Sequence, residues 1–319
     1  MPDDGGETEP TPAPDDAFAL LGNETRVAIL RILGEAGAPL SFSELHDRVE
    51  MRDSGQFNYH LEKLVGHFVS KDDDGYTLRR TGRRVVEAVL SGAVTETPDV
   101  TRTPVDESCN RCGAPIEITW DSGSVRMYCT ECAGTYGRAR GERPAEPAER
   151  GYLGRLPLPP AGVRDRTPTE VLRAAWTWGN LEIYAMASDI CPRCSATVET
   201  TTRVCDDHDA TEGLCPTCES VYAVHANIAC TNCIFEGGGA AAIGLLADTA
   251  LIAFVTDHGL NPIAPDSIRG LDGVHSDYDE EILQRDPLRA RFTFHIGDDS
   301  ISVTVDENLD VVEREPPLS

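Results

Sequence analysis

The sequence predicts a multidomain α+β protein. Residues 17–95 show three short helical patterns with capping signals, followed by a pair of strands. All eleven cysteines lie between Cys109 and Cys233, most of them in closely spaced pairs, and two short alternating runs follow near the C-terminus. The chain has 319 residues and is 40% hydrophobic, which excludes wholesale disorder and favours several small compact units over one large core.

The composition is strongly acidic. Lys and Arg total 28 against 54 Asp and Glu, so the formal net charge is −26, and only Lys63 and Lys71 are lysines. Excess carboxylates keep a protein hydrated at molar salt, so this balance indicates a haloarchaeal cytosol. The alternative is an acidic mesophile protein with acidic tails. Bulk charge of this sign argues against nucleic-acid binding, but residues 17–95 are close to neutral, with 10 cations against 11 acids.

No segment resembles a secretory signal or a membrane span. Residues 1–16 contain six acidic side chains and no cation, and they are expected to form a disordered acidic tail. The most apolar stretch, Gly237–Val255, opens with three glycines and is interrupted by Asp248, which favours a buried helix. We therefore expect a cytoplasmic protein with no membrane partner.

Residues 17–65 predict three short helices. The first follows Asn23, a good N-cap, and the second starts at a capping box formed by Ser41 and Glu44. Asp53 or Ser54 caps the third. The apolar positions at helical spacing are Val27, Leu30, Leu33, Phe42, Leu45, Val49, Phe57, Leu61, Leu64 and Val65. Three short helices with these breaks form a helix-turn-helix core.

A hairpin and a further helix follow this core. Phe68–Lys71 and Tyr76–Arg80 are predicted strands, and the turn Asp72–Gly75 joins them into a wing. The last helix spans about Thr81–Leu90. Its apolar stripe, which suits either the core or a dimer surface, is Val85, Val86 and Val89.

These residues resemble a known family. The runs FALLGNETRVAILRIL, LSFSELHDRV, DSGQFNYHLEKLVGHFV and GYTLRRTGRRV are similar to the winged helix-turn-helix of arsenical-repressor-like (ArsR-type) transcription regulators, in the form common in haloarchaea. The most specific element is the third helix, with Tyr59-His60-Leu61 and Leu64. The rest of the chain, including Ala247–Pro262, is similar to uncharacterised haloarchaeal proteins that pair such a module with zinc ribbons. The resemblance implies a DNA-binding regulator.

The chain departs from the metal-sensing members of that family. Those members carry cysteines on the DNA-reading helix, whereas residues 17–95 contain none. Arsenite or cadmium sensing of that design is therefore not expected.

Double-stranded DNA is the expected partner of this segment. The outer face of the third helix should offer side chains that can contact base edges in a major groove, namely Ser54, Gln56, Asn58, Tyr59 and Lys63. Cations at the start of the helix, on the wing and beyond it should contact phosphates, namely Arg52, Lys71, Arg79, Arg80, Arg83 and Arg84. The alternatives are plain solvated faces or a protein-docking module.

Residues 96–150 contain the first zinc-ribbon signature and a linker. Two Cys-x2-Cys pairs separated by sixteen residues are the ligands Cys109, Cys112, Cys129 and Cys132. Ile116–Trp120 and Val125–Tyr128 form a hairpin that brings the pairs together. Four thiolates leave no open coordination position, so a structural zinc is expected. A pair of disulfides is the alternative, which a reducing cytosol disfavours.

Residues 188–235 contain a second zinc-binding module with four ligand pairs: Cys191/Cys194, Cys205/His208, Cys215/Cys218 and Cys230/Cys233. The segments 196–204 and 220–229 read as uninterrupted strands, each about 30 Å long at about 3.3 Å per residue. An antiparallel hairpin would place the two inner pairs at its tip and the two outer pairs at its base. The alternative pairs the ligands sequentially along the chain. The whole chain is expected to bind two or three zinc ions, with His225 on a strand face.

The remaining segments are less specific. Residues 151–187 read as a proline-rich linker, Gly151–Arg166, and a connecting helix that starts at Thr167 with Pro168 and Glu170. Residues 236–319 read as a small α+β unit. Its expected elements are a helix at Gly244–His258 and two antiparallel strands, Phe292–Ile296 and Ile301–Val305.

The sequence favours a DNA-binding transcription regulator that is not an enzyme. No nucleophile motif is present, and Gly237–Gly239 lack the Gly-Lys-Ser/Thr that a phosphate-binding loop needs. The zinc ribbons and the C-terminal unit are expected to bind a protein partner or an effector. A homodimer remains open, as does the alternative of a zinc-ribbon adaptor that docks on another protein without DNA. An enzyme or a redox sensor is the third hypothesis.

Overall fold

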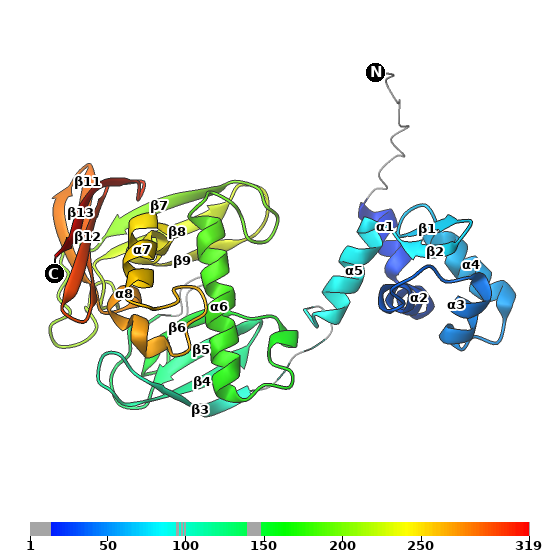
Figure 1. Cartoon of the computed structure of the whole chain (residues 1–319), viewed down its shortest axis with the longest axis horizontal. Helices are drawn as coiled ribbons and strands as arrows, with labels where there is room; N and C mark the ends of the chain where they lie inside the picture. Colours follow the sequence, from blue (N-terminus) through cyan, green and yellow to red (C-terminus); the bar gives the residue numbers. More distant parts are fainter. Residues whose placement is uncertain (1–13, 94–95, 97, 99, 139–147, 319) are drawn as a thin grey trace, which may run out of the picture. The chain divides into compact units, whose positions relative to one another are not determined.

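The chain divides into two compact units, Met1–Glu96 and Thr97–Ser319. The computed structural model describes residues 14–93, 96, 98, 100–138 and 148–318, which form a mixed α+β protein as the sequence predicts (Figure 1). Most of the predicted acidic tail, residues 1–13, lies outside the described residues. Residues 14–16, which the prediction assigned to that tail, instead begin a helix, because proline suits a first helical turn and acidic side chains stabilise it.

The first unit is a set of helices with one β-hairpin. Its elements in chain order are α1 (Pro14–Leu21), α2 (Glu24–Glu35), α3 (Phe42–Val49), α4 (Ser54–Leu64), β1 (Val69–Asp72), β2 (Gly75–Leu78) and α5 (Arg80–Leu90). The predicted caps are confirmed: the Asn23 side chain accepts the N–H of Arg26, and Ser41 and Glu44 form a capping box. Of the two alternatives for the third predicted helix, Asp53 is the N-cap.

The helices of this unit enclose a single apolar cluster. Phe57, Leu61 and Leu64 on α4 are at most 1% exposed, which confirms the predicted inner face of that helix. The hairpin pairs Val69 with Leu78 and Asp72 with Gly75. Gly75 has a φ of +132°, and a Cβ there would lie 2.5 Å from the Leu40 carbonyl oxygen, so only glycine fits this close approach.

The predicted second strand of the hairpin is two residues too long. It ends at Leu78, because Arg79 is already the N-cap residue of α5 and Arg80 is the first helical residue. The Arg79 N–H donates to the Phe68 carbonyl, which ties the start of α5 to the hairpin.

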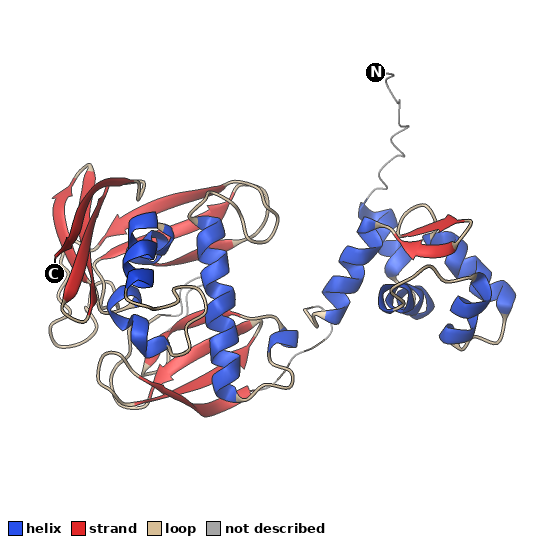
Figure 2. Ribbon diagram, viewed as in Figure 1, coloured by secondary structure: helices blue, strands red, loops and turns tan. Residues whose placement is uncertain are grey.

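The second unit contains three sheets (Figure 2). All three are antiparallel, and their strand orders are β3-β4-β5-β6, β7-β8-β9 and β10-β11-β12-β13. The strands are β3 (Val100–Ser108), β4 (Pro115–Asp121), β5 (Ser124–Cys129), β6 (Tyr152–Pro157), β7 (Val198–Val204), β8 (Val224–Cys230), β9 (Glu236–Ala240), β10 (Asp279–Arg285), β11 (Leu288–Ile296), β12 (Asp299–Val305) and β13 (Val311–Leu318). The helices are η1 (Pro160–Gly162), α6 (Pro168–Met186), η2 (Ala241–Ala247), α7 (Thr249–Asp257), η3 (Ile268–Leu271) and α8 (Asp272–His275).

Helix α6 is the long helix of this unit. Its predicted start is confirmed, with a capping box of Thr167 and Glu170 and proline in the first turn. Leu172 and Ala175 are fully buried against Ile118 and Val125 of the first sheet. Figure 1 shows α6 running from this sheet toward the sheet of β7, β8 and β9.

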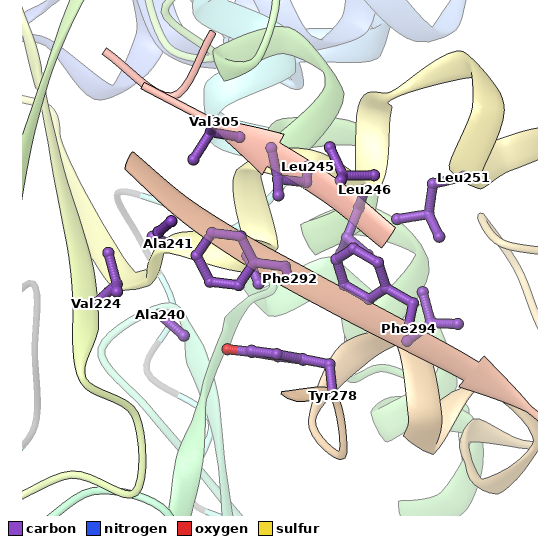
Figure 3. Close-up of a cluster of buried hydrophobic side chains, with 14 of the residues drawn as sticks. Val224, Ala240, Ala241, Leu245, Leu246, Leu251, Tyr278, Phe292, Phe294 and Val305 are labelled. Atoms are coloured by element: carbon purple, nitrogen blue, oxygen red, sulfur yellow. The ribbon is translucent and has the colours of Figure 1, made fainter. Parts of the chain in front are cut away.

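The largest apolar cluster joins the C-terminal sheet to the helices beside it. Phe292 and Phe294 of β11 are fully buried, and Figure 3 shows them beside Leu245 and Leu246 of η2. Val224 of β8 belongs to the same cluster, so the sheet that carries the second set of cysteines shares a core with the C-terminal strands.

The four segments predicted between residues 96 and 319 form one compact unit rather than separate parts. The predicted linker Gly151–Arg166 contains β6, which pairs Tyr152 with Tyr128 and completes the first sheet. The segment predicted as the first zinc ribbon thus belongs to a four-stranded sheet and does not form a hairpin alone.

The apolar stretch after residue 236 also differs from the prediction. Gly237–Gly239 lie in β9, and the predicted helix Gly244–His258 is divided in two. Asp248 divides it, because its side chain accepts the N–H groups of Ala250 and Leu251 and so starts α7 afresh. Among the described residues, no helix combines the length and apolar character needed to cross a bilayer.

Candidate metal centres

The structure gathers the predicted ligands into three groups of four. We call them the first site (Cys109, Cys112, Cys129, Cys132), the outer site (Cys191, Cys194, Cys230, Cys233) and the inner site (Cys205, His208, Cys215, Cys218). Within each site, the four ligand atoms lie within 4.8 Å of one another. All eleven cysteines are free thiols, so the structure does not have the alternative disulfides.

The β7–β8 hairpin explains why the second module has two sites. Its strands pair antiparallel from Val198 opposite Cys230 to Val204 opposite Val224. The chain therefore carries Cys205 beyond one end of the hairpin and Cys230 at the other. The ligands follow the nested arrangement, and sequential pairing does not occur.

The spacing of the ligand atoms fits a tetrahedral zinc ion. A Zn–S bond of about 2.3 Å implies sulfur atoms about 3.8 Å apart at the corners of a tetrahedron. The measured separations are 3.8 Å for Cys109–Cys132, 3.4 Å for Cys112–Cys129, 3.7 Å for Cys191–Cys233, 3.5 Å for Cys194–Cys230 and 3.5 Å from Cys218 Sγ to His208 Nδ1.

Three of the five Cys-x2-Cys turns share one backbone conformation. In each of the three, the residue after the second cysteine donates its N–H to the carbonyl of the first, and this residue has a left-handed φ of +53° to +77°. The three residues are Gly113, Ser195 and Glu219. This conformation turns the chain back and leaves both sulfur atoms on one side.

Backbone N–H groups point at the sulfur atoms. Cys129 accepts from Glu131 and Cys132 at 3.4 Å, and Cys230 accepts from Asn232 and Cys233 at 3.3 Å. Such donors stabilise a thiolate, which is the form that binds a metal ion.

The thiols of a site ionise unequally. Burial alone would raise the pKa of Cys129, but the backbone N–H donors outweigh it and lower that pKa to about 7. Backbone donors likewise lower the pKa of Cys215 to about 6, whereas burial and the neighbouring thiols raise the pKa of Cys218 to about 12. One thiolate can thus start metal binding, and a bound cation would displace the remaining protons.

The donor sets are two groups of four thiols and one of three thiols and an imidazole. These are the soft ligands that zinc takes in structural sites, and four protein donors leave no position for a reactive water. His225 is fully buried on β8 and belongs to none of the three groups.

The residues predicted to contact DNA lie in the first unit. Those on α4 are all exposed, opposite the buried Phe57, Leu61 and Leu64, and they are Ser54, Gln56, Asn58, Tyr59 and Lys63. Of the predicted phosphate-contacting residues, those that are exposed are Arg52, Lys71, Arg80, Arg83 and Arg84.

Arg79 is the exception among the predicted phosphate contacts. It is half-buried, and its guanidinium donates to the Gly66 carbonyl in the turn after α4. Arg84 also has a partner within the unit, because its Nη1 lies 3.0 Å from Glu87.

One ion pair at the outer site carries no sequence signal. Glu182 on α6 is buried and pairs with Arg193, which lies between Cys191 and Cys194. An arginine inside a cysteine pair is visible in the sequence, but nothing local identifies its partner eleven residues earlier.

Neither the curated proteins nor the solved structures include a match to this chain. A family described as domain of unknown function DUF7347 matches residues 14–89, which lie within the first unit. The model of another family matches residues 106–311, which include all three candidate metal sites and more than half of the chain. The chain therefore belongs to the family described as domain of unknown function DUF7351.

Proposed function

We propose that this protein is a DNA-binding transcription regulator. The first unit acts as a winged helix that places α4 in the major groove. The second unit holds three structural zinc ions and binds a protein partner or an effector. The observation that carries the proposal is the division of α4 into a buried apolar face and an exposed face rich in amides.

The exposed face of α4 has the chemistry of base recognition. Gln56 and Asn58 are exposed amides, a type that pairs bidentately with adenine in the major groove. The Lys63 ammonium lies 5.7 Å from the centre of the Tyr59 ring, so these two side chains form one exposed polar and aromatic surface. The buried face fixes the orientation of the helix and therefore of these amides.

Several arginines are available for phosphates. Arg52, Arg80 and Arg83 form no ion pair with any residue that the structure describes, so phosphate contact would break no existing pair. Arg79 donates to the Gly66 carbonyl in the turn after α4, so we no longer propose it as a phosphate contact. Because molar salt weakens phosphate attraction, base contacts should carry more of the affinity than in a mesophile regulator.

Selection from a random DNA pool, followed by fluorescence anisotropy in molar potassium chloride, tests this proposal. The whole chain should enrich a discrete sequence. Replacing Gln56 and Asn58 by alanine should weaken its binding about 10-fold to 100-fold per lost bidentate contact. Gln284→Ala, which removes an exposed amide of the second unit, is the matched control and should bind normally. Equal binding by all variants would refute the assigned surface.

A second function, that of a protein adaptor, is favoured by the tip of the hairpin. Three consecutive acids lie there, and the Asp72 carboxylate accepts the N–H groups of Asp74 and Gly75. These charges would repel phosphates. Replacing Asp73 and Asp74 by asparagine should strengthen DNA binding if the hairpin approaches DNA, and should leave it unchanged if the unit docks on a protein.

A further inference from the structure

An ion pair attaches the outer site to helix α6. The Glu182 side chain on α6 is 8% exposed, and both of its oxygens accept from Arg193. Arg193 Nη2 lies 3.2 Å from Oε2, and Nη1 contacts Oε1. Such two-pronged pairing fixes both the position and the orientation of the guanidinium.

Arg193 contacts one cysteine pair of the outer site directly and reaches the other through Phe235. Its backbone N–H donates to Cys191 Sγ at 3.4 Å. Its guanidinium lies 5.5 Å from the centre of the Phe235 ring, and the Phe235 carbonyl accepts the N–H of Cys230 at 3.0 Å. One residue therefore links a ligand of each cysteine pair to the helix.

The other two sites lack this link. Arg111 occupies the same position between Cys109 and Cys112, but it forms no ion pair within the described part of the chain. Thr217 occupies that position in the inner site. The chain thus contains its own comparison, an arginine with a buried carboxylate partner and one without.

We propose that Arg193 and Glu182 couple metal binding at the outer site to the packing of the C-terminal half of α6. This inference rests on the proposed metal sites. A bound metal orders the Cys191–Cys194 turn and so holds the guanidinium against Glu182. Without the metal, the turn is free to move, and Glu182 is left as a buried carboxylate without its partner, which destabilises the packed helix.

Coupling of this kind is reciprocal. If the metal stabilises the packed helix, the packed helix must stabilise the bound metal by the same free energy. Both cysteine pairs of the outer site have exposed or half-buried members, and Cys194 is exposed, whereas Cys205 and Cys215 of the inner site are buried. The first site also has an exposed ligand, Cys112, but it has two buried cysteines, as the inner site does, whereas the outer site has only one, Cys191. We therefore expect the metal of the outer site to exchange with solvent most readily, and the packing of α6 to depend on its occupancy.

Zinc release from the loaded whole chain to a chromogenic chelator tests the coupling. In Arg193→Gln, one ion of three should leave about 10-fold or more faster than in the wild type, because partners beyond the ligands commonly change metal affinity by that factor. Arg111→Gln should release all three ions at wild-type rates. Arg193→Lys keeps the positive charge but cannot pair with both oxygens of Glu182 at once. Its rate of zinc release should lie between those of the wild type and Arg193→Gln.

Two controls separate the coupling from general destabilisation. Arg314→Gln leaves Asp248, whose side chain is 6% exposed, without its arginine, as Arg193→Gln leaves Glu182. Neither Arg314 nor Asp248 is a ligand of any of the three sites. Arg314→Gln should not change zinc release. Hydrogen exchange of residues 180–186 should accelerate in Arg193→Gln and in wild type that has lost one ion.

The possible outcomes are distinct. Equal release by Arg193→Gln and Arg111→Gln, or unchanged exchange in α6 after loss of the outer ion, would overturn the coupling while leaving the metal sites intact. A whole chain that takes up no zinc would contradict the proposed metal sites, and the coupling with them.

Discussion

The two units differ in how their elements are held together. The first unit has no cysteine and is held by helices around one apolar cluster that includes Ile29, Leu45 and Phe57. The second unit joins three sheets, and it contains three four-ligand sites at the ends of its hairpins. We therefore expect loss of metal to loosen the hairpins of the second unit and to leave the first unit, which contains no ligand, packed around its apolar cluster.

Removing metal should produce the largest difference between the two units. With excess chelator, hydrogen-exchange protection should collapse in the first sheet and in β7–β9, because structural zinc contributes about 10–16 kcal/mol in small zinc-binding peptides. Residues 24–90 should keep their protection, since they contain no ligand of any site. Equal loss of hydrogen-exchange protection in both units would contradict the expectation that only the second unit depends on metal.

Truncating a core side chain of the first unit should destabilise that unit alone. Leu61 is 1% exposed, so Leu61→Ala should destabilise this unit by about 4 kcal/mol through lost burial and a cavity. Urea unfolding followed by hydrogen exchange should show only the first unit shifted. Glu62→Ala, an exposed change on the same helix, is the control. A parallel shift of both units would mean that they unfold together.

A buried carboxyl group offers a smaller, pH-dependent effect in the second unit. Glu280 accepts the N–H of Ala223 at 2.6 Å and that of Val224 at 3.4 Å, and its other oxygen has no partner within the described structure. Burial raises the pKa of Glu280 from 4.5 to about 7. The folded protein therefore holds a proton that the unfolded chain releases, and the unit loses stability as the pH rises from about 4.5 to 7.

Glu280→Gln should remove this dependence. The variant should be more stable than the wild type by about 3 kcal/mol at pH 8, and by less than about 1 kcal/mol at pH 5, where Glu280 is neutral in the folded state. Thermal unfolding at the two pH values is the measurement. A variant that is less stable at both values would show that the carboxylate is charged and needed.

The strands show what the sequence can predict. The strands at the centre of a sheet, β4, β5, β8, β11 and β12, all lie where strands are predicted. Five edge strands lie where none is predicted: β3, β6, β9, β10 and β13. An edge strand pairs on one side only and contributes less to the core, so it can hold the prolines of β13 or the glycines of β9 without an alternating pattern.

In the candidate sites too, features set by local sequence are predictable, whereas features set by packing are not. Short-range spacing identifies the cysteine pairs, and the length of two strands favours the nested ligand sets that the structure has. Helix caps such as Asn23 and Thr167 are equally local, and they are confirmed. The partner of Arg193 is not predictable, because it depends on how α6 packs against the outer site.

The most direct test of the account is an occupancy map of the whole chain across the genome of cells that express it, made in parallel with the Gln56→Ala, Asn58→Ala double variant. The account predicts discrete sites that share a sequence motif for the wild type. It also predicts loss of those sites for the variant at equal protein abundance. A wild-type map without enrichment, or an unchanged map for the variant, would contradict DNA recognition by α4.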